Sequence, residues 1–405
     1  MSHRYIGGAL LAAASLLAGP SSAHAQLSGG SIPSTSGEGG GFQTPQSPNP
    51  VIPLPTGHAG DAGFYTAFEF VLLTQTRAIG NQTIARRGFF DVGGQISGVS
   101  GTLIGSGTQA LNAQDFSKRT FQPGGKIEIG YRFDDGTRIY YNMIHLYDAH
   151  ASQGATAIPP GFVTRPDQAD TFISSPVVNF PNFFNGAVGK VSGVSDSSVP
   201  GIWNASSRMD IKFTERYQQM QAGMSVPLLQ TEYSRVYGTA GLQFSWFFER
   251  FQWITASQDQ AGNARNVDVA FYTNTLSQRL YGPYFGCGHE VFVADQFSLS
   301  ADLTGSVLLN SYKERAKYKL GDQTVQSKYG RDDFRLVPNA NAAVNLWWYP
   351  IEGVQLRIGY QAMTFFNTVY MRDPVGFDYG NINPGYATKY FRLVHGFNVG
   401  IGFFF

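Results

Sequence analysis

The chain ends in the stretch Phe391–Phe405 (FRLVHGFNVGIGFFF), in which two kinds of side chain alternate. Its odd-numbered positions carry Phe, Leu, Val or Ile apart from His395, whereas most even-numbered positions carry Gly, Asn or Arg. A period of two places alternate residues on opposite faces, so the stretch predicts a strand rather than a helix. Soluble strands average about 5–6 residues and a tilted strand needs about 9–11 to cross a bilayer, so this strand is long enough to span a membrane.

The same alternation recurs upstream and predicts nine further strands. The first begins after Gly63, where Phe64, Thr66 and Phe68 share one face. Two irregularities interrupt the pattern. Gly282-Pro283 predicts a bulge or kink because proline donates no ladder hydrogen bond, and Glu215 falls on the apolar face of its strand. The ten predicted strands lie within residues 64–75, 127–133, 138–143, 208–214, 235–249, 267–291, 297–307, 340–348, 354–360 and 391–405.

Short and long links alternate between these strands. The short links are residues 134–136, 225–234, 294–296 and 349–353. The long links are residues 77–120, 149–207, 254–266, 311–333 and 372–389. Short turns at one rim and long loops at the other are typical of outer-membrane barrels, as are aromatic residues near strand ends, such as Trp246, Trp253, Trp347 and Trp348.

The pattern therefore predicts an all-β fold, a transmembrane antiparallel up-and-down β-barrel over residues 63–405. We expect ten strands, or twelve if residues 77–120 or 149–207 contain another hairpin. The strand number should be even, with the short turns and both termini in the periplasm and the long loops outside. Alternating strands leave no unpaired edge in lipid only if the sheet closes on itself.

The final strand and its terminal aromatic residue resemble the C-terminal strand of bacterial outer-membrane barrel proteins. The resemblance implies that Phe405, with Phe403 and Ile401 on the same face, forms part of a signal read by the barrel-assembly machinery. The Gly- and Pro-rich leader and the early strand Ala67–Leu72 (AFEFVL) are also similar to the β-barrel porin family of planctomycete-type bacteria. This resemblance implies a porin-like protein in the bacterial outer membrane.

The N-terminal segment has the features of an export signal. Arg4 precedes the short apolar run Gly8–Ala18 (GALLAAASLLA), and Ala23-His24-Ala25 matches a signal-peptidase site. We expect residues 1–25 to be a signal peptide. Residues 26–62 are rich in Gly, Pro and Ser and cannot bury enough apolar surface to fold, so they predict a disordered leader.

The composition excludes several classes of protein. Charged residues make up only 14% of the 405 residues, against about 25% in soluble domains. Lys and Arg (29) nearly balance Asp and Glu (28), so the chain has no basic field for nucleic acid. The single cysteine, Cys287, excludes a disulfide framework and a multi-cysteine zinc site. We expect no metal site, no cofactor and no catalytic residues.

The polar faces of the predicted strands carry more basic than acidic residues. Lipid must contact the apolar faces, because a Lys or Arg facing lipid at the midplane costs about 2–4 kcal/mol. The polar faces should therefore line the lumen and, with ten basic residues against five acidic ones, favour anions. The predicted pore-lining residues are Lys126, Arg132, Arg138, Arg208, Lys212, Arg216, Arg235, Arg357, Arg392, Glu128, Asp210, Glu249 and Asp302, and Arg279 and Glu69 complete the two counts.

Three functions are open at this point. The first is a porin-like channel for passive passage of small hydrophilic solutes, with a mild anion preference. The second is a filled structural or surface-interaction barrel, because side chains alone can fill a narrow barrel. The third is an outer-membrane hydrolase, in which Asp148 and His150 at the outer rim would activate water, although no nucleophile motif accompanies them.

The expected partners follow from the fold. They are outer-membrane lipid, the barrel-assembly machinery during biogenesis and the small solutes themselves, without nucleic acid. The sequence leaves the oligomeric state open, an oligomer included.

Overall fold

A computed structural model of the chain describes residues 62–94, 96–118, 120–156, 166–181, 202–204, 206–231, 233–258, 263–294, 296–324 and 326–405. The predicted signal peptide and almost all of the predicted leader lie outside these residues. In the described part of the chain, no helix is long and apolar enough to cross a membrane. Nearly all of its regular structure is antiparallel strand, as predicted.

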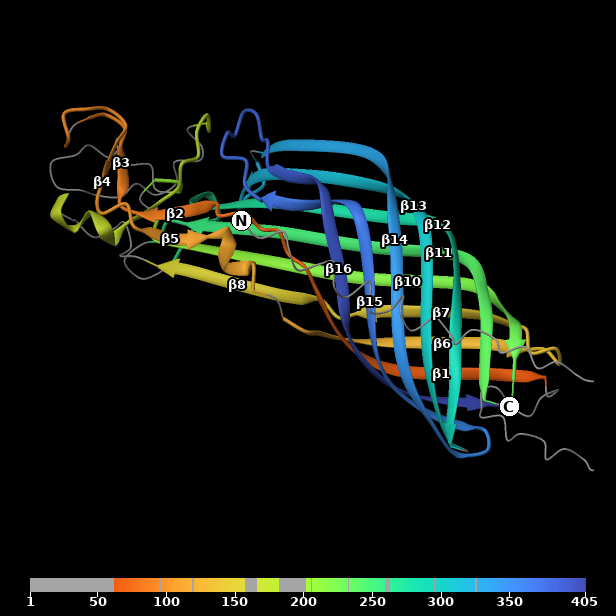
Figure 1. The fold of residues 1–405 in the computed structure, drawn as a ribbon. Coiled ribbons are helices and arrows are strands. Elements are labelled where there is room, and N and C mark those ends of the chain that lie inside the picture. The colour runs from red at the N-terminus through yellow and green to blue at the C-terminus, as the bar shows by residue number, and fades with distance from the viewer. Residues whose placement is uncertain are drawn as a thin grey trace, which may run out of the picture. The chain divides into compact units, whose positions relative to one another are not determined.

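Ten strands of the described residues form one sheet that closes on itself (Figure 1). Each pairs with the next along the ring, and pairing of β1 with β16 and of β10 with β11 completes the circle. The prediction of a ten-stranded barrel is therefore confirmed. The barrel strands are β1 (Gly63–Gln75), β6 (Gln122–Arg132), β7 (Arg138–Leu146), β10 (Arg208–Gln230), β11 (Ser234–Ala256), β12 (Val269–Ala294), β13 (Phe297–Leu320), β14 (Gln326–Ile351), β15 (Val354–Asp373) and β16 (Gly385–Phe404).

The first two long links contain short elements but, among the residues described, no additional barrel hairpin. β8 (Ala149–Thr156) pairs with β10 just beyond β7 and so lengthens the wall that β7 begins. β2, β5 and β9 form a small separate sheet, and β3 pairs with β4. The remaining elements are β2 (Thr83–Arg87), β3 (Phe89–Asp91), β4 (Thr102–Ile104), β5 (Gln109–Asn112), β9 (Ile173–Ser174) and the short 3-10 helices η1 (Ala113–Phe116), η2 (Pro166–Thr171) and η5 (Asn266–Asp268).

The barrel is apolar outside and polar inside, as the alternation predicted. On β13, Phe297, Leu303 and Val307 face outward and are exposed, whereas Ser298 and Ser300 between them are buried. The outward apolar side chains form a belt that ends near Leu309 on β13. Within the belt, the barrel strands bury their polar faces and expose their apolar faces, which is the arrangement that lipid requires.

Several predicted link boundaries were wrong because strands continue beyond the belt. The predicted long link at residues 311–333 belongs mostly to β13 and β14, and only residues 321–325 join them. Beyond Leu309 the outward positions of β13 become Ser311, Lys313 and Arg315, so apolar periodicity no longer marks the strand although its pairing to β14 continues. β10 likewise extends to Gln230, into the predicted link 225–234, with a register shift between Pro227 and Leu229.

The predicted irregularities at Gly282-Pro283 and Glu215 do not break their strands. β12 keeps the same register with β13 on both sides of Gly282-Pro283, and its pairing with β11 runs through these residues. The predicted bulge is therefore absent: Gly282 and Pro283 have no partners on β13, but the loss of pairing is confined to these two residues. Glu215 stays within β10 and points inward, where an arginine pairs with it.

The C-terminal strand completes the ring next to β1. Ile401 pairs with Phe68, and the backbone N–H of Phe405 donates to the carbonyl of Phe64 at 2.8 Å. The Phe397, Val399 and Ile401 side chains face outward with the belt. Closure thus depends on residues at the very end of the chain, since an unclosed sheet would leave backbone groups unpaired in lipid.

Deletion of Phe405 should impair assembly of the barrel. We expect a clear drop in folded protein in the outer membrane, because the deletion removes a backbone hydrogen bond to β1 and the predicted assembly signal of Phe405, Phe403 and Ile401. The measurement is the fraction that migrates as compact barrel on unboiled gels. Deletion of a leader residue such as Gly39 is the control. Equal compact fractions for both deletions would show that Phe405 carries no such signal.

Candidate functional site in the barrel interior

A polar cavity of about 200 Å³ lies inside the barrel, within the belt. Residues of every barrel strand line it, because each strand points every second residue inward. Three basic side chains line it, Lys126, Arg138 and Arg357, against the acidic Glu128 and Asp302. Tyr140, Asn142, Gln219, Gln221, Asn341, Asn345, Trp347, Gln355 and Gln361 are among its uncharged polar and aromatic lining residues.

Carboxylates neutralise much of the positive charge around the cavity. Glu69, almost fully buried, pairs with Lys126 at 3.1 Å and also with Arg357, whose guanidinium lies over the Trp347 ring. Asp302 accepts a hydrogen bond from the Tyr237 hydroxyl. Deeper toward the turns, Arg235 pairs with Glu290 at 2.6 Å. The lumen therefore carries a nearly balanced charge network rather than a wall of unpaired cations.

A layer of buried apolar side chains closes the lumen beyond the cavity. We call this layer the septum. Its members are no more than 3% exposed, and every barrel strand except β6 contributes at least one. Phe247 packs edge-on against Phe365 with ring centroids 5.0 Å apart, and the Tyr217 ring centroid lies 4.8 Å from that of Phe247. The septum consists of Val71, Leu73, Ile144, Leu146, Tyr217, Phe247, Leu280, Leu308, Val337, Met363, Phe365 and Val394.

Two buried ion pairs lie next to the septum on the loop side. Arg392 donates to Glu249 at 2.5 Å, and both side chains are 1% exposed. Arg77, which follows β1, reaches into the barrel and pairs with Glu215 at 2.7 Å. Arg77 also donates to the carbonyls of Phe116 and Lys118, so it ties the segment around η1 to the barrel wall.

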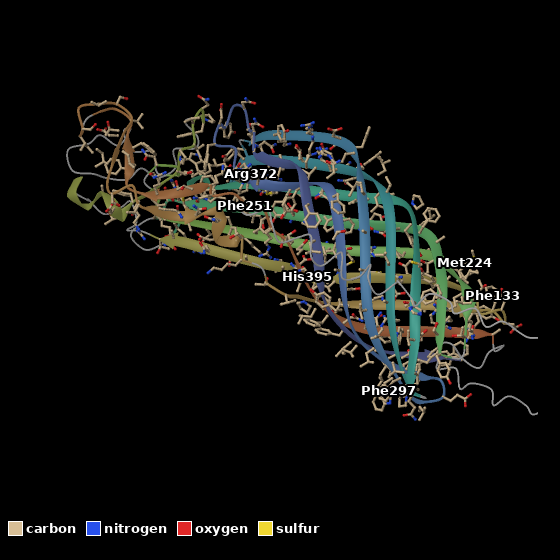
Figure 2. All side chains as sticks on the ribbon, viewed as in Figure 1. Phe133, Met224, Phe251, Phe297, Arg372 and His395 are labelled. Atoms are coloured by element: carbon tan, nitrogen blue, oxygen red, sulfur yellow. The ribbon has the colours of Figure 1, made fainter. Side chains whose placement is uncertain are left out.

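A second apolar core fills the loop end of the barrel. Phe213, Phe251 and Trp253 of the wall pack there with Phe116 and Trp203 from the intervening segments. Figure 2 shows the two ends: Phe133, Met224 and Phe297 lie at the turn end, and Phe251 and Arg372 lie toward the loop end. In this structure the described residues therefore leave no continuous open path along the lumen.

Most predicted pore-lining residues lie on the inward face. Lys126, Arg138, Arg357, Glu128 and Asp302 line the cavity. Arg132 and Arg235 are buried nearer the turns, and Arg392 and Glu249 form the buried pair beyond the septum. Whether any of them lines a conducting pore stays a prediction.

Four predicted pore-lining residues lie on the wrong face for that role. Residues Arg208, Asp210, Lys212 and Arg216 occupy the outward positions of β10, because Gln219 and Gln221 of the same strand line the cavity and the faces alternate. Inward positions there hold Met209, Ile211 and Phe213, which pack in the second apolar core. This half of β10 lies beyond the apolar belt, so the rule that apolar faces point outward no longer applies and is here reversed. Arg279 also faces outward, on β12.

Asp148 and His150 each contact a different residue of β10. Both carboxylate oxygens of Asp148 accept hydrogen bonds from Arg216, at 2.6 and 2.7 Å, and these bonds hold the pKa of that carboxyl below its usual range. The His150 Nδ1 lies 3.1 Å from the Thr214 hydroxyl. Each side chain is therefore engaged by a neighbour on β10.

Sequence reasoning missed the septum and the partners of the buried cations. Val71, Leu73, Leu280 and Leu308 are apolar residues at inward positions, and this departure from alternation was the available signal. The periodicity places Arg77 in a loop and shows Glu215 only as an irregularity. Their pairing depends on a loop that enters the barrel, and the alternation of side chains along a strand does not predict the path of a loop.

Comparisons with solved structures return outer-membrane barrels at low similarity. The outer membrane protease OmpT from Escherichia coli is 10% identical, with 85% of this chain and 97% of that chain covered and a TM-score of 0.41. The Pseudomonas putida toluene transporter TodX is 9% identical over 84% and 89% of the two chains, with a TM-score of 0.26. A major outer membrane protein from Thermus thermophilus is 9% identical over 84% and 99%, with a TM-score of 0.24. With TM-scores below 0.5, these structures carry no inference about function.

A search of curated proteins finds no match. The family model described as "Legionella pneumophila major outer membrane protein precursor" matches residues 97–389. That match spans most of the barrel, from before β6 into β16. The closer similarity to planctomycete-type porins stays a prediction. Because the match covers well over half of the sequence and the fold is a closed barrel with an apolar belt, this chain is a bacterial outer-membrane β-barrel protein that belongs to the Legionella pneumophila major outer membrane protein family.

Proposed function

We propose that the protein is a passive outer-membrane channel for small hydrophilic solutes and that its lumen is closed, in the state described, by the septum. The observation that carries this proposal is the polar cavity within the belt. Its lining brings Lys126, Arg138 and Arg357 to membrane depth, where charged groups are costly and usually mark a solute path. A barrel with a purely mechanical role has no need of such a cavity.

The septum fits this proposal as a hydrophobic gate. An apolar constriction excludes water and stops conduction until it widens. The septum lies beyond the cavity, so a solute that enters from the periplasmic side would meet polar groups first. Conduction then requires the septum and the ion pairs next to it to rearrange.

The proposed channel has only a weak anion preference. Of the charged side chains that line the cavity, three are basic and two are acidic, an excess of one. Glu69 further offsets Lys126 and Arg357. The larger excess of basic over acidic residues that the sequence predicted for the lumen depended partly on Arg208, Lys212 and Arg216, which face outward. The small ion selectivity should therefore fall further with salt as the Debye length shrinks.

A filled structural barrel is the second candidate. The septum favours it, since apolar side chains from nine strands pack there with at most 3% exposure. Neither candidate involves catalysis, and we propose that the protein is not an enzyme, because Asp148 is bound by Arg216 and His150 by Thr214.

Single-channel recording in a planar bilayer separates the two candidates. A channel should show discrete openings, separated by long closures, and a reversal potential in a salt gradient slightly on the anion side. Complete absence of openings over a wide voltage range would support the filled barrel. Clear cation preference would contradict the charge argument while leaving the channel itself intact.

A further inference from the structure

The outward face of β10–β14 becomes strongly basic just beyond the belt. On β13 the outward residues Val307 and Leu309 end the belt, and Lys313, Arg315, Lys317 and Lys319 follow at every second position. Basic residues continue this surface on the neighbouring strands. We define the basic patch as Lys212, Arg216, Arg250, Arg279, Lys313, Arg315, Lys317, Lys319 and Lys328.

Strand register makes these residues one continuous surface. Thr275 of β12 pairs with both Arg250 of β11 and Arg315 of β13, so the two arginines flank one position. One row further from the belt, Lys317 lies directly opposite Lys328 of β14. Like charges directly opposite in a sheet are destabilising unless an anion separates them.

Few carboxylates neutralise the patch. Arg216 pairs with Asp148, and Arg315 pairs with Asp332 at 2.7 Å, which holds the pKa of the Asp332 carboxyl below its usual range. Asp332 also lies directly opposite Lys313 in the strand register, and in the parts of the chain that the structure covers no carboxylate forms an ion pair with the remaining six basic residues. Lys319 and Arg250 instead lie over the Phe271 and Phe248 rings. The patch therefore carries a large uncompensated positive charge.

The position of the patch fits lipid headgroups rather than a soluble anion. Lys313 follows Leu309 by four residues, about 13 Å along the strand, so it stands at the height where acyl chains give way to headgroups. Directly below it the belt presents Leu309, Tyr281 and Leu336, which are exposed apolar side chains for acyl chains to contact. A soluble polyanion has no acyl chains, so it would contact the basic residues but not the apolar surface next to them.

The patch also lies on the side of the membrane that faces outward. It occupies the half of β13 far from Phe297, and Phe297 lies at the turn end of the barrel (Figure 2). The C-terminal end of β16 and the start of β1 meet at that same turn end. Short turns and termini are periplasmic in such barrels, which places the patch at the outer leaflet.

We propose that the basic patch and the belt below it form a binding site for a phosphate-bearing glycolipid of the outer leaflet. Its phosphates would lie among Arg279, Lys313 and the facing pair of Lys317 and Lys328, and its acyl chains would lie along the belt. Basic clusters next to an apolar membrane surface recognise anionic lipid headgroups in this way. The lipid also supplies the anion that the facing Lys317 and Lys328 lack.

The test compares lipid binding by folded protein and two triple variants. The patch variant is Arg279→Gln, Lys313→Gln, Lys317→Gln. The matched control is Arg86→Gln, Arg372→Gln, Lys389→Gln, which removes three exposed cations outside the patch. Purified protein in detergent is titrated with bisphosphorylated lipid A, and bound lipid is counted by native mass spectrometry. A shift in gel migration between unboiled and boiled samples verifies that each variant is folded.

We expect the patch variant to bind lipid A at least about tenfold more weakly than wild type, and the control to match wild type. Lipid A without its phosphates should bind weakly to all three proteins. Equal binding by patch variant and control would overturn the proposal, as would equal binding of the dephosphorylated lipid. Competition by soluble polyphosphate at the same phosphate concentration would also overturn it, because the patch would then be a general anion surface.

Discussion

Replacing Phe247 and Phe365 together with alanine should raise the conductance of the barrel by more than about tenfold. The two rings meet edge-on in the middle of the septum, and both are at most 1% exposed. Their removal opens a gap next to Tyr217 that water can enter, and a wetted constriction conducts ions. The measurement is mean current per reconstituted barrel in a planar bilayer at fixed voltage.

The matched control replaces Phe70 and Phe397 with alanine. These residues are also phenylalanines on barrel strands, but they face lipid and are 54% and 55% exposed. The septum variant loses buried contacts, which cost about 3–5 kcal/mol for a Phe-to-Ala change in a core, so its folding is verified by heat-dependent gel migration. A folded septum variant whose current equals that of the control would refute the septum as the gate.

Replacing Glu249 with leucine should destabilise the barrel by about 3–5 kcal/mol, because it leaves Arg392 buried without its counter-charge. The Arg392 guanidinium is 1% exposed and lies between the Phe247 and Tyr370 rings. Glu249 also accepts a hydrogen bond from the Met371 backbone N–H at 3.2 Å. The measurement is the free energy of unfolding from urea titration in detergent, followed by tryptophan fluorescence.

The double variant Glu249→Leu, Arg392→Met should recover most of that loss. Removal of both charges leaves no ion to desolvate, and apolar replacements of buried pairs are often neutral. The exposed pair of Arg315 and Asp332 offers a control, since Asp332→Asn should change stability little. A single variant as stable as wild type, or a double variant no better than the single, would show that the pair contributes nothing specific.

The sequence predicted the inward face correctly where exclusion from lipid imposes the rule. Exclusion from lipid predicts inward positions for Lys126, Arg138, Arg357, Glu128 and Asp302, and these residues line the cavity. The rule failed for Arg208, Lys212 and Arg216 because β10 continues beyond the belt. There the outward positions are polar, and the apolar face packs inward on Trp203 and Phe116. The same alternation thus has opposite meanings within the belt and beyond it.

The sequence by itself determined a closed barrel of ten or twelve strands with an apolar outer face, and the structure decided that ten strands form the ring. Period-two alternation is a local property, and lipid allows such strands only one arrangement, with apolar residues outside and no free edge. Only the tertiary structure decided what fills the lumen. The septum, the pairing of Arg77 with Glu215, and that of Arg392 with Glu249 join residues far apart in the chain. Their contacts depend on strand register and on a loop that enters the barrel, and neither leaves a periodic signal in the sequence.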